Sequence, residues 1–283
     1  MLDIRVLGPL QLRSGNALPT PTAPKERKIL ALLLMHAGHT VPVTTLIEEL
    51  WSDRPPRTAV TAIQAYVLNI RRNLAVALGL RTADVRADLL RTKNKGYAFH
   101  TVDCHFDLPR YRCLESSGRQ ALRAGDRDRG VRLLRQADGL WHGSLLAGVD
   151  RGFPLRAATV SLEQSRLSAR ILRIETEIGM GCHQCVRPEL AELVAQFPFD
   201  ELLHRHYMTV LHLSGMRTEA LDVFRQLRRT MAEKTGLEPS DELQSLYQEI
   251  HGESHGAIGR EMRERTVRCG SPASSTTACK SPM

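Results

Sequence analysis

The sequence predicts a mainly α-helical protein whose small β-sheets are confined to the N-terminal third. Three observations lead to this prediction. Alternating apolar residues mark strands near the N-terminus and again around residues 89–100. From about Phe106 to Ile250 apolar residues recur at helical spacing, in segments separated by breaks that contain Gly, Pro or Asp. The chain has 283 residues, enough for two domains.

The first elements are short strands followed by a helix. Residues 2–20 alternate in hydropathy and contain a Ser14-Gly15-Asn16 turn, which predicts paired strands. Pro24 occupies a favourable first-turn position of a helix that ends by Gly38. The buried face of this helix is predicted to carry Ile29, Leu30, Leu33 and Leu34. Residues 39–43 are expected to form a brief extended link.

Two more helices and a hairpin complete the N-terminal third. Thr44 or Thr45 is a candidate cap for a second helix, which the paired prolines 55 and 56 separate from a third. The third helix is predicted from Thr58 to Leu78. Strands 89–92 and 97–100 then flank a tip formed by residues 93–96. This order of strands, three helices and a basic hairpin is that of a winged helix-turn-helix.

The third helix carries the candidate base-reading residues. At 100° per residue, Ile63, Val67, Ile70 and Leu74 form a narrow apolar stripe that predicts the core-facing side. Small, amide and arginine side chains lie opposite, and such groups bond base edges or contact thymine methyls in the major groove. A solvated amphipathic helix would show the same residue types. The candidate base-reading residues are Thr61, Gln64, Leu68, Asn69 and Arg72.

The hairpin tip and the helix ends carry the candidate phosphate contacts. Lys93 and Lys95 make the tip doubly basic, and a hairpin in this position reaches phosphates or the adjacent minor groove. A merely solvated turn is the alternative. The candidate phosphate and wing residues are Arg57, Thr58, Arg71, Thr92, Lys93, Asn94 and Lys95, with Lys25 and Lys28 as further candidates.

The positive charge is concentrated in the N-terminal third. The whole chain has a formal net charge of +8. Residues 1–103 contain 14 Lys and Arg against 8 Asp and Glu, whereas residues 104–283 contain 25 against 23. This distribution favours a polyanionic partner for the first segment, although a solvated basic face would have the same composition.

The chain resembles the SARP family, the Streptomyces antibiotic regulatory proteins, over about residues 2–251. The third helix, from Thr61 to Leu74, resembles the family's reading helix, and further matching stretches are residues 6–10, 46–51, 55–56 and 96–97. In the helical region the matches are residues 140–143, 146–149, 219–224, 236–240 and 242–243. Leu68 departs from the small polar residue common at its position. The absence of a GxxxxGK[ST] motif indicates the short form of the family.

The resemblance implies an OmpR-type winged helix over residues 1–103 and a TPR-like, all-helical bacterial transcriptional activation domain over residues 104–251. A disordered tail is expected over residues 252–283, which turn rich in Gly, Ser and Thr. The resemblance also implies an activator of a secondary-metabolite (antibiotic) gene cluster. Its implied partners are double-stranded DNA containing direct repeats, RNA polymerase holoenzyme, and a second protomer in a homodimer or side by side on the DNA.

Other classes of function receive less support. A protein-interaction adaptor, whose winged helix binds protein instead of DNA, is the main alternative. We expect no enzyme, because no nucleophile, metalloprotease or nucleotide-loop motif occurs, and His204 and His212 are expected to be surface or satisfied side chains. We expect no cofactor and no metal, and the lone CxxC of Cys182 and Cys185 predicts a turn between helices. Without a signal peptide or long apolar run, a cytoplasmic, nucleoid-associated location is expected, with no membrane partner.

Overall fold

The computed structural model describes residues 2–101 and 104–252 in two compact units, which divide at residues 173 and 174. The first unit therefore joins the winged helix to the first helices that follow it. Mostly helical elements and small sheets agree with the predicted fold class. Apart from Gly252, the tail expected from residue 252 lies outside the described residues.

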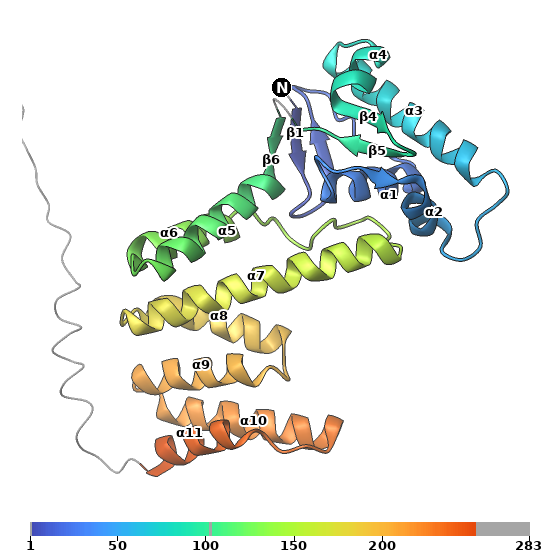
Figure 1. The fold of residues 1–283 in the computed structure, drawn as a ribbon. Coiled ribbons are helices and arrows are strands. Elements are labelled where there is room, and N and C mark those ends of the chain that lie inside the picture. Colours follow the sequence, from blue (N-terminus) through green and yellow to red (C-terminus); the bar gives the residue numbers. More distant parts are fainter. Residues whose placement is uncertain (1, 102–103, 253–283) are drawn as a thin grey trace, which may run out of the picture. The chain divides into compact units, whose positions relative to one another are not determined.

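Two three-stranded sheets frame the N-terminal part (Figure 1). In the first, β1 (Leu2–Arg5) lies between antiparallel β2 (Gln11–Arg13) and parallel β6 (Cys104–Phe106). In the second, β5 (Gly96–Phe99) lies between β3 (Val41–Pro42) and β4 (Leu90–Lys93). The strand β3 replaces the expected extended link, and β6 was not anticipated. Both are very short, so alternation of hydropathy along the sequence gives almost no signal for them.

Three helices pack between and beside these sheets. They are α1 (Pro24–Met35), α2 (Val43–Trp51) and α3 (Ala59–Leu78), close to the predicted bounds. α1 buries every residue from Ile29 to Met35, instead of the single face that its periodicity predicts, because it is the central helix of the core. α2 begins directly after Pro42, without the side-chain cap expected from Thr44 or Thr45. A short α4 (Thr82–Asp84) and a π-helical turn, η1 (Val85–Leu89), lead into β4.

The rest of the first unit is a helical hairpin, a loop and a long helix. α5 (Asp107–Arg123) and α6 (Arg127–Asp138) pack against each other, and Gly118 and Gly130 allow the contact, since a Cβ on either would meet a leucine side chain of the other helix at under 3 Å. Residues 139–152 contact the segment that follows β1: His142, Leu146 and Ala147 donate backbone hydrogen bonds to the carbonyls of residues 6–8. α7 (Phe153–Gly179) follows and passes the division between the units.

The second unit is a stack of helices (Figure 1). α8 (His183–Gln196), α9 (Glu201–Leu213), α10 (Arg217–Thr235) and α11 (Asp241–Gly252) follow one another through short turns. Its core contains Met208, Leu211, Phe224, Leu227 and Leu243. This succession of packed helix pairs agrees with the expected TPR-like architecture.

Candidate nucleic-acid interface

The outward face of α3 is exposed along its length. Thr61, Gln64, Leu68, Asn69 and Arg72 are all exposed, while Ile63, Val67, Ile70 and Leu74 on the opposite side are buried. Among the described residues, the side chains of Thr61, Gln64 and Arg72 have no hydrogen-bond or ion-pair partner. The periodicity of α3 therefore predicted its two faces correctly. Thr61, Gln64 and Arg72 therefore present polar groups that the fold itself does not use.

Asn69 differs from the other four, because its side chain is bonded to α1. Its Nδ2 donates to Oε1 of Glu26 at 3.0 Å. Glu26 lies in the first turn of α1 and is only 8% exposed. The two helices are thus tied together at one edge of the exposed face.

Arg71 follows the exposed face in sequence but points into the protein. It is buried, and its Nε and Nη2 donate to the carbonyl oxygen of Leu90 at 3.0 and 2.7 Å. Nη2 also donates to Oγ1 of Thr92 at 2.9 Å, and the guanidinium lies 5.7 Å from the centre of the Tyr97 ring. Burial lowers the pKa of Arg71. The structure thus places this predicted phosphate contact where it holds the hairpin against α3.

The hairpin β4–β5 forms the wing. Lys93 pairs with Gly96, so Asn94 and Lys95 make a two-residue turn, and both have positive φ, 33° and 60°. Thr92, Lys93, Asn94 and Lys95 are exposed. Gly96 is required, because a Cβ there would lie 2.4 Å from the carbonyl oxygen of Val41. The tip therefore presents two lysines to solvent on a hairpin held by β3 and Arg71.

Two predicted phosphate contacts, Arg57 and Thr58, directly precede α3, and both are exposed. Thr58 occupies the cap position, and its side chain forms no capping hydrogen bond. Of the further lysine candidates, Lys25 lies 5.0 Å from the centre of the Trp51 ring. Lys28 forms an ion pair with Asp150 at 2.5 Å and is mostly buried, so it serves the fold.

Sequence reasoning missed two exposed apolar residues of α3. Val60 is 50% exposed and Val76 is 85% exposed. Both lie outside residues 61–72, where the base contacts are predicted, and the available signal in the sequence was the position of Val76 opposite the apolar stripe. By helical periodicity Val76 lies on the same side of α3 as Leu68, whereas Val60 lies beside the buried stripe.

A joint between α2 and the N-terminus of α7 was also missed. Glu49 of α2 is 1% exposed and accepts from the backbone N–H of Gly152 at 2.6 Å and of Leu155 at 2.9 Å. These donors lie at the N-terminus of α7, where unpaired N–H groups favour an acceptor. Burial raises the pKa of Glu49. A Cβ at Gly152 would approach the Glu49 carbonyl oxygen to 2.3 Å, so the contact needs glycine.

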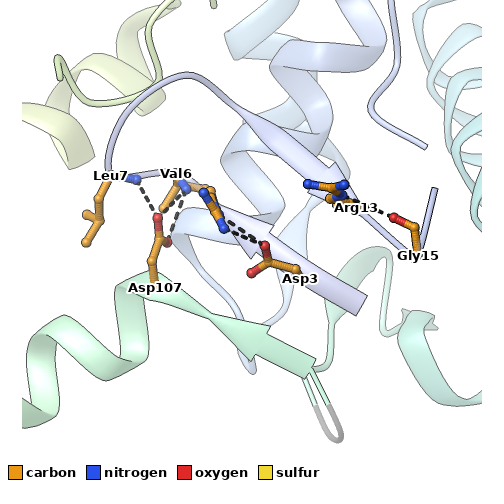
Figure 2. Close-up of polar contacts among 7 residues, drawn as sticks. Asp3, Val6, Leu7, Arg13, Gly15 and Asp107 are labelled. Carbon is orange, nitrogen blue, oxygen red and sulfur yellow. Dashed lines mark hydrogen bonds and ion pairs between the residues drawn. The ribbon is translucent and has the colours of Figure 1, made fainter. Parts of the chain in front are cut away.

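A second carboxylate, that of the half-buried Asp107, ties the segment after β1 to the start of α5 (Figure 2). Asp107 accepts from the backbone N–H of Val6 at 2.9 Å and of Leu7 at 3.0 Å. Burial raises its pKa. Glu49 and Asp107 together fasten the winged helix to the helices that follow. Neither is recognisable in the sequence, since each contact spans about 100 residues.

The remaining predicted sites are unremarkable in their surroundings. Cys182 occupies the N-cap position of α8 without a capping side-chain hydrogen bond, and Cys185 lies in the first turn of the helix. His204 is buried and its Nδ1 lies 2.8 Å from the carbonyl oxygen of Asp200. No group of three or more His, Cys, Asp or Glu that could hold a metal occurs in the part of the chain that the structure describes. In the same residues, no helix has the length and apolar character of a membrane span.

Two family models match this chain. Residues 18–99 match the C-terminal domain of transcriptional regulatory proteins, and residues 106–251 match the bacterial transcriptional activator domain. The first match contains α1 to the wing and the second begins at the end of β6.

Named regulators align with most of the chain. It is 37% identical to the regulatory protein DnrI of Streptomyces peucetius over 249 residues, which are 88% of this chain and 92% of that protein. It is 32% identical to the regulatory protein AfsR of Streptomyces griseus over 88% of this chain and 24% of that longer protein.

A solved structure shares the fold. Mycobacterium tuberculosis EmbR, in complex with a low-affinity phosphopeptide, aligns with a TM-score of 0.75 and 28% identity, covering 94% of this chain and 69% of that chain. With the winged helix, the helical stack and both family matches in place, the chain belongs to the SARP family of transcriptional regulators.

Proposed function

We propose that the protein is a sequence-specific DNA-binding transcription activator that reads the major groove with α3 and contacts phosphates with the wing. The observation that carries this proposal is the exposed face of α3. Thr61, Gln64 and Arg72 have no partner among the described residues, and Arg71 of the same helix bonds Leu90 and Thr92 of the strand that leads to the basic wing tip. Amide, hydroxyl and guanidinium groups of this kind bond base edges, and lysines at a tip bond phosphates.

Each candidate residue has a place in this proposal. Thr61, Gln64, Leu68, Asn69 and Arg72 read bases. Arg57, Thr58 and the wing residues Thr92, Lys93, Asn94 and Lys95 contact the backbone, while Arg71 holds the wing in position. Phosphate contacts make binding fall with salt, whereas base contacts make it depend on sequence.

The family and the activator-domain match support activation through protein contact. The protein would bind direct repeats near promoters as side-by-side protomers, recruit RNA polymerase and control a secondary-metabolite gene cluster. Direct repeats require a head-to-tail arrangement of protomers, since a two-fold axis would give inverted repeats. The work of such an activator is done at the nucleoid.

A gel-shift titration of the full chain against upstream DNA of the neighbouring genes, at moderate salt, tests the proposal. The expected result is a retarded complex that unlabelled cognate DNA displaces and scrambled DNA of equal length does not. Binding without sequence preference, together with capture of a protein partner by the winged helix, would favour the adaptor function instead.

A further inference from the structure

The hydrogen bond between Asn69 and Glu26 fixes which end of the Asn69 amide faces outward. Glu26 contributes a carboxylate, which accepts hydrogen bonds and has no N–H to donate. The atom of Asn69 that faces the Glu26 carboxylate must therefore be the amide nitrogen, in agreement with the 3.0 Å distance between Nδ2 of Asn69 and Oε1 of Glu26. The opposite end of the planar amide, the carbonyl oxygen, is then directed away from Glu26.

The Glu26 side chain is held firmly enough to impose this orientation on the Asn69 amide. Glu26 is 8% exposed and lies in α1, whose following turns are buried in the core. Asn69 itself is exposed, one turn after Ala65 and three residues before Arg72 on the outward side of α3. An amide that is free to rotate offers a donor or an acceptor, but this one is restricted to a single orientation.

We propose that Glu26 is a positioning residue for specificity, and that Asn69 presents a fixed acceptor that reads an exocyclic amino group in the major groove. The inference rests on the proposed DNA-reading function. Adenine N6 and cytosine N4 both carry such a group, whereas guanine O6 and thymine O4 are acceptors at the corresponding edge. The contact therefore favours adenine or cytosine over guanine or thymine at one position of the site.

The test uses the full-length chain and duplexes in which each position of the recognition site carries all four bases in turn. For the wild type we expect one position at which adenine or cytosine is preferred by about fivefold or more. The same series of duplexes shows whether adenine or cytosine is the preferred base. Asn69→Ala should abolish the preference at that position and leave the others unchanged.

Glu26→Ala is the decisive variant, because it keeps Asn69 but removes the hydrogen bond that orients the Asn69 amide. The same single preference should collapse, and the double variant Glu26→Ala/Asn69→Ala should lose no more than Asn69→Ala alone. Glu48→Ala, which removes an exposed glutamate of the same winged helix, controls for the change in net charge and should keep every preference. If Glu26→Ala fails to fold, Glu26→Gln replaces it, since a glutamine amide can donate to Asn69 and permits the flipped orientation.

Two results would overturn the inference while leaving DNA reading intact. One is retention of all preferences by Asn69→Ala, and the other is loss in Asn69→Ala but full retention in both Glu26 variants. A wild-type protein with no sequence preference on any duplex would instead refute the proposed function and the inference together.

Discussion

The exposed face of α3 and the joint at Glu49 are built on opposite principles. On α3, Thr61, Gln64 and Arg72 have polar groups with no partner among the described residues. At the joint, the Glu49 carboxylate is removed from solvent and bonded to two backbone N–H groups. Substitutions on the first should change binding with little effect on stability, and substitutions at the second should do the reverse. Under the proposed function, this difference separates residues that contact DNA from residues that stabilise the fold.

The largest expected effect is on stability, at the joint. Glu49→Ala leaves the N–H groups of Gly152 and Leu155 without their acceptor, so the free energy of unfolding should fall by about 2–4 kcal/mol. Urea unfolding followed by circular dichroism measures this loss. Glu48→Ala, at the exposed neighbouring residue, should change stability by less than about 0.5 kcal/mol. Equal effects of the two variants would refute the structural role of Glu49.

Next is the effect of Arg72 on base recognition. Arg72→Ala should weaken binding to the cognate site by about 1–3 kcal/mol and leave binding to scrambled DNA almost unchanged. Fluorescence anisotropy on both duplexes gives the two values, and Arg81→Ala serves as control, since Arg81 is exposed but paired with Asp84 of α4. Equal losses on both duplexes would make Arg72 a phosphate contact.

Arg71 sharpens the comparison. It adjoins Arg72 in the chain, but its guanidinium, like the Glu49 carboxylate, is buried and hydrogen-bonded within the fold. Arg71→Ala removes the bonds to Leu90 and Thr92 that hold the wing. We expect lower stability together with weaker binding to cognate and scrambled DNA alike. Arg71→Lys should behave nearly as badly, since an ammonium cannot reproduce the forked contact of a guanidinium. A variant that binds normally at full stability would contradict this assignment.

The wing lysines should have a smaller and sequence-independent effect. Lys93→Ala and Lys95→Ala should each reduce the slope of log affinity against log salt by about one, with cognate preference retained. The measurement is a salt titration of binding on both duplexes. An unchanged slope would indicate that the tip is solvated in the complex.

The smallest effect is a pH dependence at the joint. Because burial raises the pKa of Glu49 from its ordinary 4.5, the folded protein binds this proton more tightly than the unfolded chain does. The proton-linked part of the stability is therefore present at low pH and is lost as the pH rises through the raised pKa, while the carboxylate still accepts from the two backbone N–H groups. Relative to Glu49→Gln, the wild type should lose stability between pH 4.5 and neutrality, measured by urea unfolding. A relative gain over this interval would contradict the sign of the shift.

The sequence predicted the helices of the N-terminal part and both faces of α3, because a buried stripe at helical spacing is a local property. It missed β3, β6, Glu49 and Asp107. These depend on pairings between distant segments, which leave no pattern in either segment alone. Arg71 shows the same limit within the site. Its position on α3 predicted a phosphate contact, but only the fold shows that its guanidinium donates to Leu90 and Thr92 instead.

The central claim, that the outward face of α3 lies against bases, is tested most directly by site-specific crosslinking. A photoreactive amino acid replaces Leu68, which is 38% exposed in the middle of this face, and in a control it replaces Phe153, which is 69% exposed at the start of α7. On irradiation with the cognate duplex, we predict a protein–DNA crosslink from position 68 that maps within the recognition site, and none from position 153. Absence of a crosslink from position 68, under conditions where the complex is fully formed, would contradict the account.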